Sequence, residues 1–149
     1  KIRTRNKNLY KTWVGSDAKL EGERAALWLE DYLDKMRRSE EKINIVVLQG
    51  TTGSSVQLGR TIGFDTISDT HDNWHILEQE SGDFTTAKGK EVMLGFLDKY
   101  EDIDVLVSQN DDMTFGVIEA LNDAGYTTGI NGDIKIISFD ACLDALEKV

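Results

Sequence analysis

The chain has 149 residues, 40% of them hydrophobic and 30% charged, which is typical of one globular domain with its own core. Its 27 acidic and 17 basic residues give a net charge of −10. This charge argues against a general nucleic-acid surface or a surface for anionic membranes, because phosphate binding needs concentrated positive charge. The single cysteine, Cys142, excludes an internal disulfide. No apolar run approaches the ~18 residues of a membrane span, so no direct membrane insertion is expected.

The N-terminal segment is basic and has no apolar period over its first 11 residues. It is either a solvated connecting arm or an arm that binds a polyanion. A β-type run, Tyr10–Val14, follows and ends where Ser16 or Asp17 could cap a helix. The spacing predicts that helix over Ala18–Arg37. We expect its apolar flank to comprise Leu20, Ala25, Leu27, Trp28, Tyr32 and Leu33.

The remainder alternates between short β-type runs and helical patterns. The predicted strands are Ile43–Leu48, His75–Gln79, Val105–Ser108 and Ile134–Phe139. The predicted helices are Ser54–Ser68, Thr85–Tyr100, Asp111–Ala124 and a last one over Cys142–Val149. Strand–helix alternation indicates βαβ units. With Tyr10–Val14 as a further candidate strand, we predict an α/β fold: a doubly wound, mainly parallel five-stranded sheet with helices on both faces.

Polar clusters follow four of the predicted strands. They are Gln49–Ser54, Gly82–Thr85, Gln109–Asp112 and Asp140-Ala141. Ligands of open parallel sheets bind beyond the carboxyl ends of the strands, where such loops converge. The pattern therefore predicts both the fold and the place of a binding site.

The first of these clusters continues through Gly50–Ser55 into a helix. It lacks the Lys-Ser/Thr ending of a P-loop and the glycine spacing of a dinucleotide site. The segment is either a tight turn or a turn that presents side chains to a neutral polar ligand. On the helix behind it, Arg60 either faces solvent or aims a guanidinium fork into a cleft.

The other three clusters offer one candidate ligand each, beside a local explanation. One residue of Gln109–Asp112 must cap the next helix, and Asn110 is the candidate ligand because an amide both donates and accepts. Asp140 is either the cap of the last helix or an acceptor for paired hydroxyls. Phe84 either forms a hydrophobic staple or covers the C–H face of a sugar.

No arrangement for catalysis or metal binding stands out. His71 and His75 straddle a probable turn and have no third ligand nearby, so neither a metal nor a cofactor is expected. Neither histidine falls at a strand-end loop, so no Ser-His-Asp or Cys-His set is apparent. The acidic loop tips lack the acidic pair and the later lysine of a phospho-acceptor domain. We therefore expect no catalytic residue.

The loop motifs, taken in order, resemble the type I periplasmic sugar-binding proteins of ABC transporters, in the ribose- and galactofuranose-binding branch. The similarity is collinear over roughly residues 9–149. The motifs that carry it are Leu48-Gln49-Gly50-Thr51-Thr52-Gly53 with Arg60 and Gly63-Phe64, Gln79–Thr85 with Lys88-Gly89, Gln109–Met113 with Gly116, and Ser138-Phe139-Asp140.

The resemblance implies a protein of two lobes that close on a sugar about a hinge. Residues 1–15 would then be an arm with the first hinge-crossing strand, and residues 16–149 a truncated C-terminal ligand-binding lobe. The chain starts without methionine and stops within a helical pattern, so we expect a piece of a larger protein. Such proteins are extracytoplasmic, in the periplasm or lipid-anchored at the cell surface. A signal sequence would lie outside this piece.

The resemblance also implies binding without chemistry. The family's sugar-contacting positions fall on Arg60, Phe84, Asn110 and Asp140, which are the candidates that the local pattern selects. The implied partners are a monosaccharide of pentose or furanose type, the missing N-terminal lobe and an ABC transporter permease. The family usually has glycine after the final aspartate, where this chain has Ala141.

Other functions share this fold. One alternative is the effector-binding domain of a LacI-type transcription regulator, and another is a sugar-sensing receptor domain. A helix-turn-helix or a transmembrane helix elsewhere in the gene would reveal them. A more distant alternative is a phosphate-handling enzyme that uses Gly50–Ser55 and the acidic loop tips.

Overall fold

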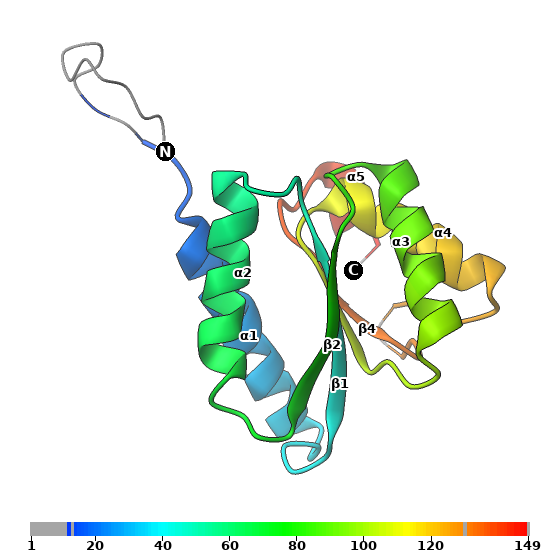
Figure 1. The fold of residues 1–149 in the computed structure, drawn as a ribbon. Coiled ribbons are helices and arrows are strands. Elements are labelled where there is room, and N and C mark those ends of the chain that lie inside the picture. The colour runs from blue at the N-terminus through cyan, green and yellow to red at the C-terminus, as the bar shows by residue number, and fades with distance from the viewer. Residues whose placement is uncertain (1–11, 13, 130, 149) are drawn as a thin grey trace.

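The computed structural model describes residues 12, 14–129 and 131–148, and in them nine regular elements (Figure 1). The strands are β1 (Ile43–Gln49), β2 (Trp74–Ser81), β3 (Val105–Ser108) and β4 (Lys135–Ile137). The helices are α1 (Ala18–Lys35), α2 (Ser55–Ser68), α3 (Thr86–Lys99), α4 (Asp111–Asp123) and α5 (Leu143–Leu146). Within the described residues, no helix is both long and apolar enough to cross a membrane.

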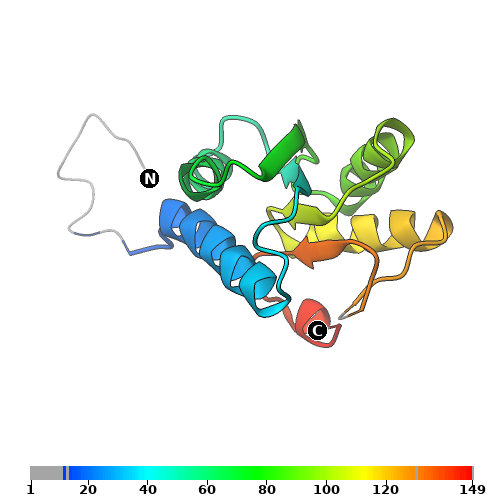
Figure 2. The ribbon, with the colours of Figure 1, turned by 90° about the horizontal axis from the view of Figure 1, so that it is seen from below.

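The four strands form one parallel sheet in the order β2-β1-β3-β4. Helices α1 and α2 cover one face, and α3 and α4 cover the other (Figures 1 and 2). The prediction of a doubly wound parallel sheet is therefore confirmed. The predicted number of five strands is wrong for the described residues. The fifth candidate, Tyr10–Val14, lies outside them apart from Thr12 and Val14, which have no regular structure.

Side-chain caps fix where the helices begin. The Asp17 carboxylate accepts a hydrogen bond from the amide of Leu20 at 3.2 Å, which decides between the two caps that the sequence left open for α1. Ser54, Thr85 and Asn110 cap α2, α3 and α4 in the same way. Most predicted boundaries hold within about two residues. The exception is α5, which ends three residues earlier than predicted, and Val149 lies outside the described residues.

The core consists of one apolar cluster on each side of the sheet. The central strands β1 and β3 supply both clusters, because their alternate side chains point to opposite faces and almost all are buried. Helices α1 and α2 close the first cluster, and α3 and α4 close the second. Because the core takes up the side chains of the central strands, the candidate site is formed by residues that follow the strands.

The predicted apolar flank of α1 is only partly right. Leu20, Leu27 and Trp28 are 40%, 48% and 51% exposed, whereas the buried residues are Gly22, Ala25, Ala26, Leu29 and Leu33. The reason is the close approach of α2: a Cβ atom on Gly22 would lie 2.1 Å from the carbonyl oxygen of Arg60. The helix turns its small residues, rather than its largest ones, toward this contact.

Candidate functional site

Arg60 lies on the second turn of α2 and is 7% exposed, which excludes the solvent-facing alternative. Its Nε donates to Glu21 Oε2 at 2.9 Å, and its Nη2 donates to Asp140 Oδ1 at 2.8 Å. Its Nη1 donates to the carbonyl oxygen of Gln109. The guanidinium also lies 4.6 Å from the ring centroid of Phe139. These contacts hold the fork in one orientation, with three of its five N–H groups in use.

Asp140 stands in the loop after β4 and does not cap the last helix. The cap position of α5 is Cys142, whose side chain makes no capping bond. The Asp140 side chain is 47% exposed, and its Oδ2 accepts no hydrogen bond from any described residue. The carboxylate therefore holds Arg60 with one oxygen and keeps the other for a further donor.

The backbone at Asp140 and Ala141 is in the left-handed region, with φ values of 94° and 57°. Glycine is favoured in this region because it has no Cβ, which explains why glycine suits the position of Ala141. The neighbouring Asp111 helps to hold this turn. Its two carboxylate oxygens accept hydrogen bonds from the Ser138 hydroxyl and from the amide of Cys142, on either side of Asp140.

Asn110 is the residue of its cluster that caps α4. Its Oδ1 accepts from the amide of Met113 at 3.0 Å. Its Nδ2 makes no hydrogen bond to any described residue, so a donor remains for a ligand. The residue is 6% exposed. Asn110 is thus both the helix cap and the candidate ligand. The sequence pattern had not shown that one side chain could fill both roles.

Phe84 lies in the loop between β2 and α3, and the staple explanation is wrong. The staple partner would be Gly89, four positions after the cap Thr85, and glycine has no side chain to offer. The tip of the ring instead lies on Gly50, where an added Cβ would come within 1.8 Å of Cζ. The backbone of this loop has an unusual conformation, with positive φ values of 53° at Asp83 and 57° at Phe84. This conformation sets the direction of the Phe84 ring.

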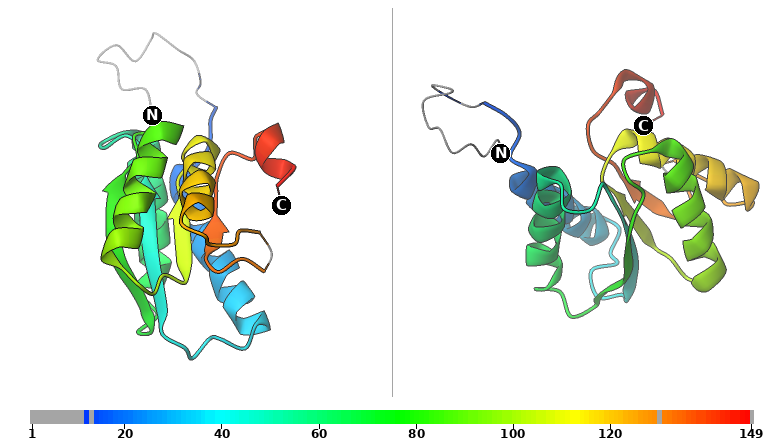
Figure 3. Two further views of the ribbon diagram at one scale, coloured as in Figure 1. Left: turned by 90° about the vertical axis from the view of Figure 1, so that its right-hand side faces the viewer. Right: turned by 45° about the horizontal axis from the view of Figure 1, so that its top comes forward.

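Phe84, Asn110 and Asp140 follow β2, β3 and β4, and Arg60 lies in α2, which follows β1. The strands are parallel, so the segments that follow them lie at the same edge of the sheet (Figure 3, right). Arg60 and Asp140 are in direct contact. Asn110 follows Gln109, whose carbonyl oxygen accepts from Arg60. Phe84 joins the group through Gly50, whose amide donates to the Gln109 side chain at 3.0 Å. The structure thus connects all four through neighbouring loops.

Two residues of this arrangement were missed in the sequence. Gln109 is 1% exposed and links the strand ends: its side-chain amide also donates to Thr61 Oγ1 at 2.9 Å. Its place in a polar run after a strand was a usable signal. Glu21 reaches Arg60 from 39 residues away, and an acidic residue in the first turn of a helix gave no reason to expect that contact.

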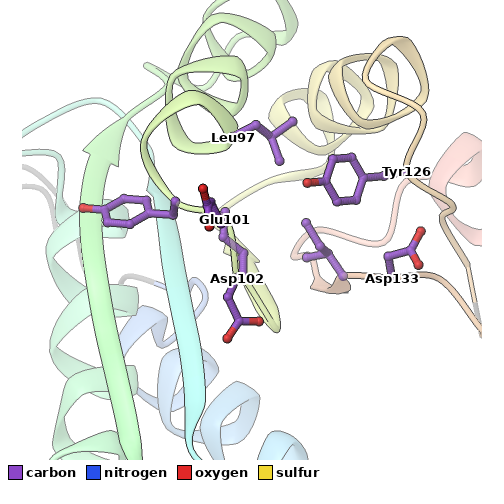
Figure 4. Close-up of a pocket in the computed structure, with 8 residues that line it drawn as sticks. Leu97, Glu101, Asp102, Tyr126 and Asp133 are labelled. Atoms are coloured by element: carbon purple, nitrogen blue, oxygen red, sulfur yellow. The ribbon is translucent and has the colours of Figure 1, made fainter.

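The opposite edge of the sheet carries a hollow of about 170 Å³ at the amino ends of β3 and β4 (Figure 4). Its walls include Leu97, Tyr126 and the acidic residues Glu101, Asp102 and Asp133. The Asp102 and Asp133 carboxylates point to different sides (Figure 4). Asp102 accepts from the Asn44 side chain, and Asp133 accepts from the amide and hydroxyl of Thr127. These polar groups do not converge on a common point.

One of the two histidines, His71, has local partners. His71 stacks on Trp74 with ring centroids 4.2 Å apart and lies 3.7 Å from Glu30. Among the described residues, no group of three or more His, Cys, Asp or Glu side chains is arranged to hold a metal ion.

A family model for the periplasmic binding protein domain matches residues 5–149, nearly the whole chain. The chain belongs to this family. The resemblance inferred from the loop motifs is thereby confirmed. Among curated relatives in the family, the chain is 37% identical over 146 residues to the galactofuranose-binding protein YtfQ of Escherichia coli (strain K12). It is 34% identical over 138 residues to the ribose import binding protein RbsB of Bacillus subtilis (strain 168).

The alignments cover 96% and 93% of this chain but only 44% and 41% of these two relatives. The chain therefore spans less than half the length of the family members that it matches. A solved structure from Mycobacterium smegmatis in complex with β-D-fucofuranose superposes with a TM-score of 0.87 at 38% identity. That superposition covers 98% of this chain and 46% of the other.

Proposed function

We propose that the chain is the carbohydrate-binding lobe of an ABC-transporter substrate-binding protein, and that it holds a monosaccharide of pentose or furanose type for uptake without chemistry. The observation that carries the proposal is the buried guanidinium of Arg60, fixed between Asp140 and the Gln109 carbonyl at the carboxyl edge of the sheet. A planar donor beside a half-exposed carboxylate suits adjacent sugar hydroxyls, which both donate and accept.

Each of the four site residues makes a different contact with the sugar in this proposal. Arg60 has two N–H groups beyond the three used by the protein, and these donate to hydroxyl oxygens. The free Oδ2 of Asp140 accepts from a hydroxyl, and the Nδ2 of Asn110 donates to a third. Phe84 covers an apolar C–H face of the sugar. A wrong epimer leaves one of these groups unpaired in a dry cleft, and this penalises its binding.

The furanose preference comes from the relatives. The names of YtfQ and of the Mycobacterium smegmatis complex specify galactofuranose and fucofuranose, at 37% and 38% identity to this chain. Both matches run through all four loops of the site, because they cover nearly the whole chain. We therefore place a five-membered sugar ring against Arg60 and Asp140.

The whole protein would close a second, N-terminal lobe over this one and present the closed surface to the transporter permease. The lobe, arm and hinge assignment for residues 1–15 and 16–149 is part of this proposal, as is an extracytoplasmic location. A single lobe supplies one wall of the site. We expect the intact protein to bind at about micromolar, or ~8 kcal/mol, and the isolated lobe far more weakly.

Calorimetry of the intact protein with a panel of monosaccharides tests the proposal. D-ribose, L-arabinose and D-galactose are the first probes, with D-mannitol as an acyclic control. Replacing the guanidinium (Arg60→Met) removes charge-assisted hydrogen bonds, so affinity should fall by about 100-fold, or ~2.7 kcal/mol. Arg24→Met is the matched control: Arg24 is an exposed arginine on α1, and its loss should change affinity less than twofold.

Arg60→Met also removes a buried charge from between two carboxylates and could unfold the protein. Asp140→Asn therefore serves as the second variant, because its side chain is half exposed and its loss is tolerable to the fold. Micromolar binding that survives both substitutions would contradict the assigned site. Absence of binding to every sugar in the wild-type protein would contradict the function itself.

A further inference from the structure

The guanidinium of Arg60 is paired with two carboxylates rather than one. Glu21 Oε2 lies 2.9 Å from Nε, and Asp140 Oδ1 lies 2.8 Å from Nη2. Only the second carboxylate belongs to the four residues assigned to the sugar. The three side chains together carry one positive and two negative charges, so the site has no spare positive charge for an anionic ligand.

The contact with Glu21 is built into the packing of α1 on α2. Gly22 lies against the backbone of Arg60, and a Cβ there would be 2.1 Å from the Arg60 carbonyl oxygen. Gly63 of α2 lies against α1 in the same way: a Cβ atom added to Gly63 would be 2.0 Å from the carbonyl oxygen of Lys19. These close approaches bring the Glu21 side chain to Nε and leave it 29% exposed. Its position is therefore determined by the helix contact and not by a flexible surface pair.

We propose that Glu21 is a specificity-determining residue of the sugar site, which orients Arg60 and cancels its charge so that neutral sugars bind and sugar acids are rejected. This inference rests on the proposed function. Glu21 acts through Arg60 as a positioning residue, and its two effects are separable. Its oxygen fixes the guanidinium plane by accepting from Nε, and its negative charge repels a carboxylate that approaches the exposed side of Asp140.

Two substitutions separate the effects. Glu21→Gln keeps an oxygen that can accept from Nε but removes the charge. Glu21→Ala removes both. With the neutral sugar, we expect Glu21→Gln to change affinity less than threefold and Glu21→Ala to weaken it about tenfold. With the matching sugar acid, Glu21→Gln should strengthen binding about tenfold, or ~1.4 kcal/mol, since one repulsive charge is gone.

The measurement is calorimetry on the intact protein with paired probes that both keep the sugar ring: D-galactose with D-galacturonate, and D-ribose with D-riburonate. For the pair whose neutral sugar binds, the result is the ratio of the dissociation constant of the sugar acid to that of the neutral sugar. A purely structural role of Glu21 would weaken both members alike and leave this ratio unchanged. The ratio therefore reports charge selection and not folding.

Glu23→Gln is the matched control on the same helix. Glu23 pairs with Lys19 at 2.9 Å, whereas the carboxylates paired with Arg60 are those of Glu21 and Asp140. Its loss removes the same charge but should move the ratio less than twofold. The inference is overturned if Glu23→Gln matches Glu21→Gln, if Glu21→Gln leaves the ratio unchanged, or if the wild-type protein binds the acid as tightly as the neutral sugar. Absence of binding to any neutral sugar would instead refute the proposed function.

Discussion

The two ends of the sheet differ in how their polar side chains are used. At the carboxyl end, the guanidinium of Arg60 donates to Glu21, Asp140 and the Gln109 carbonyl oxygen. Two of the four candidate residues, Asp140 and Asn110, each keep a hydrogen-bonding atom that has no partner among the described residues. At the amino end, the hollow of about 170 Å³ has three acidic residues in its wall. There Asp102 and Asp133 are occupied by neighbouring groups and point apart (Figure 4).

The contrast indicates that converging polar groups, rather than a hollow in the surface, distinguish the candidate site. Around the hollow at the amino end, Asp102 and Asp133 each form hydrogen bonds with a neighbouring residue and not with a common group. A binding site needs groups that are held rigidly by one set of bonds and still have capacity for another. Substitutions at the two ends should therefore differ in kind.

The largest effect on stability should come from Asp111 at the carboxyl end. Asp111 is 4% exposed, and Asp111→Ala removes the two charge-assisted hydrogen bonds that its carboxylate accepts from the Ser138 hydroxyl and the Cys142 amide. We expect a loss of about 3 kcal/mol in the free energy of unfolding, measured by urea denaturation. Sugar affinity should fall as well, because the Asp140 turn is no longer held.

The adjacent Asp112 provides the control for this prediction. It is exposed, and the structure shows no hydrogen bond or ion pair from its side chain to a described residue. Asp112→Ala should cost no more than about 0.5 kcal/mol. Equal losses for the two substitutions would mean that the turn is not held through Asp111.

A smaller effect is expected from the contact beneath Phe84. Gly50→Ala places a Cβ within 1.8 Å of the ring, so the ring must move away. Overpacking of this kind should cost about 1–2 kcal/mol, and it should weaken sugar binding by displacing the aromatic wall. Unfolding and calorimetric titration of the same variant measure the two effects.

Gly95→Ala is the counterpart away from the site. Gly95 lies inside α3, and a Cβ there meets nothing within 4 Å. Alanine is the better helix former, so this variant should gain about 0.5–1 kcal/mol and bind sugar as the wild type does. A stabilised Gly50→Ala variant would show that the Phe84 ring is free to move, and would weaken the case for a fixed wall.

The smallest effect belongs to the amino end and depends on pH. The pKa of Asp133 is lowered below its usual value of 3.8, chiefly by the hydrogen bond from the Thr127 amide and secondly by the one from the Thr127 hydroxyl. A lowered pKa in the folded state means that the contribution to stability is present above pH 3.8 and is lost as pH falls through the lower value.

Unfolding of the wild type and of Asp133→Asn at pH 7 and near pH 2 measures this contribution. The two proteins should differ at pH 7 and converge in acid, while sugar affinity at pH 7 stays within twofold. A difference in stability that does not change with pH would contradict the linkage. A large change in sugar affinity would break the distinction between the two ends of the sheet.

Much of the fold could be predicted from the sequence because its signals are local. β-type runs alternate with helical patterns, and Ser54, Thr85 and Asn110 each cap the helix that follows them. The parallel arrangement follows from that alternation, and it places the four polar loops at one edge. The sequence therefore predicts Phe84, Asn110 and Asp140 on these loops, and Arg60 on the helix behind the first of them, as site residues.

What could not be predicted depends on distant segments. The buried face of α1 was misjudged because its position is set by close contacts with α2, which favour Gly22 and Ala26 over larger side chains. The two alternatives for Phe84 could not be separated either, because the place of its ring is decided by Gly50, on another loop. In both cases two elements approach more closely than either sequence pattern shows.

The layered parallel sheet, the edge at which the candidate residues lie and the types of these residues could all be predicted from the sequence alone, because caps, periodicity and strand ends are properties of neighbouring residues. Only the tertiary structure decided that Arg60 is held between Glu21 and Asp140, 39 residues before it and 80 residues after it. Such pairings cannot be read locally, since they depend on how closely two helices pack and on the direction that a strained turn gives to one carboxylate.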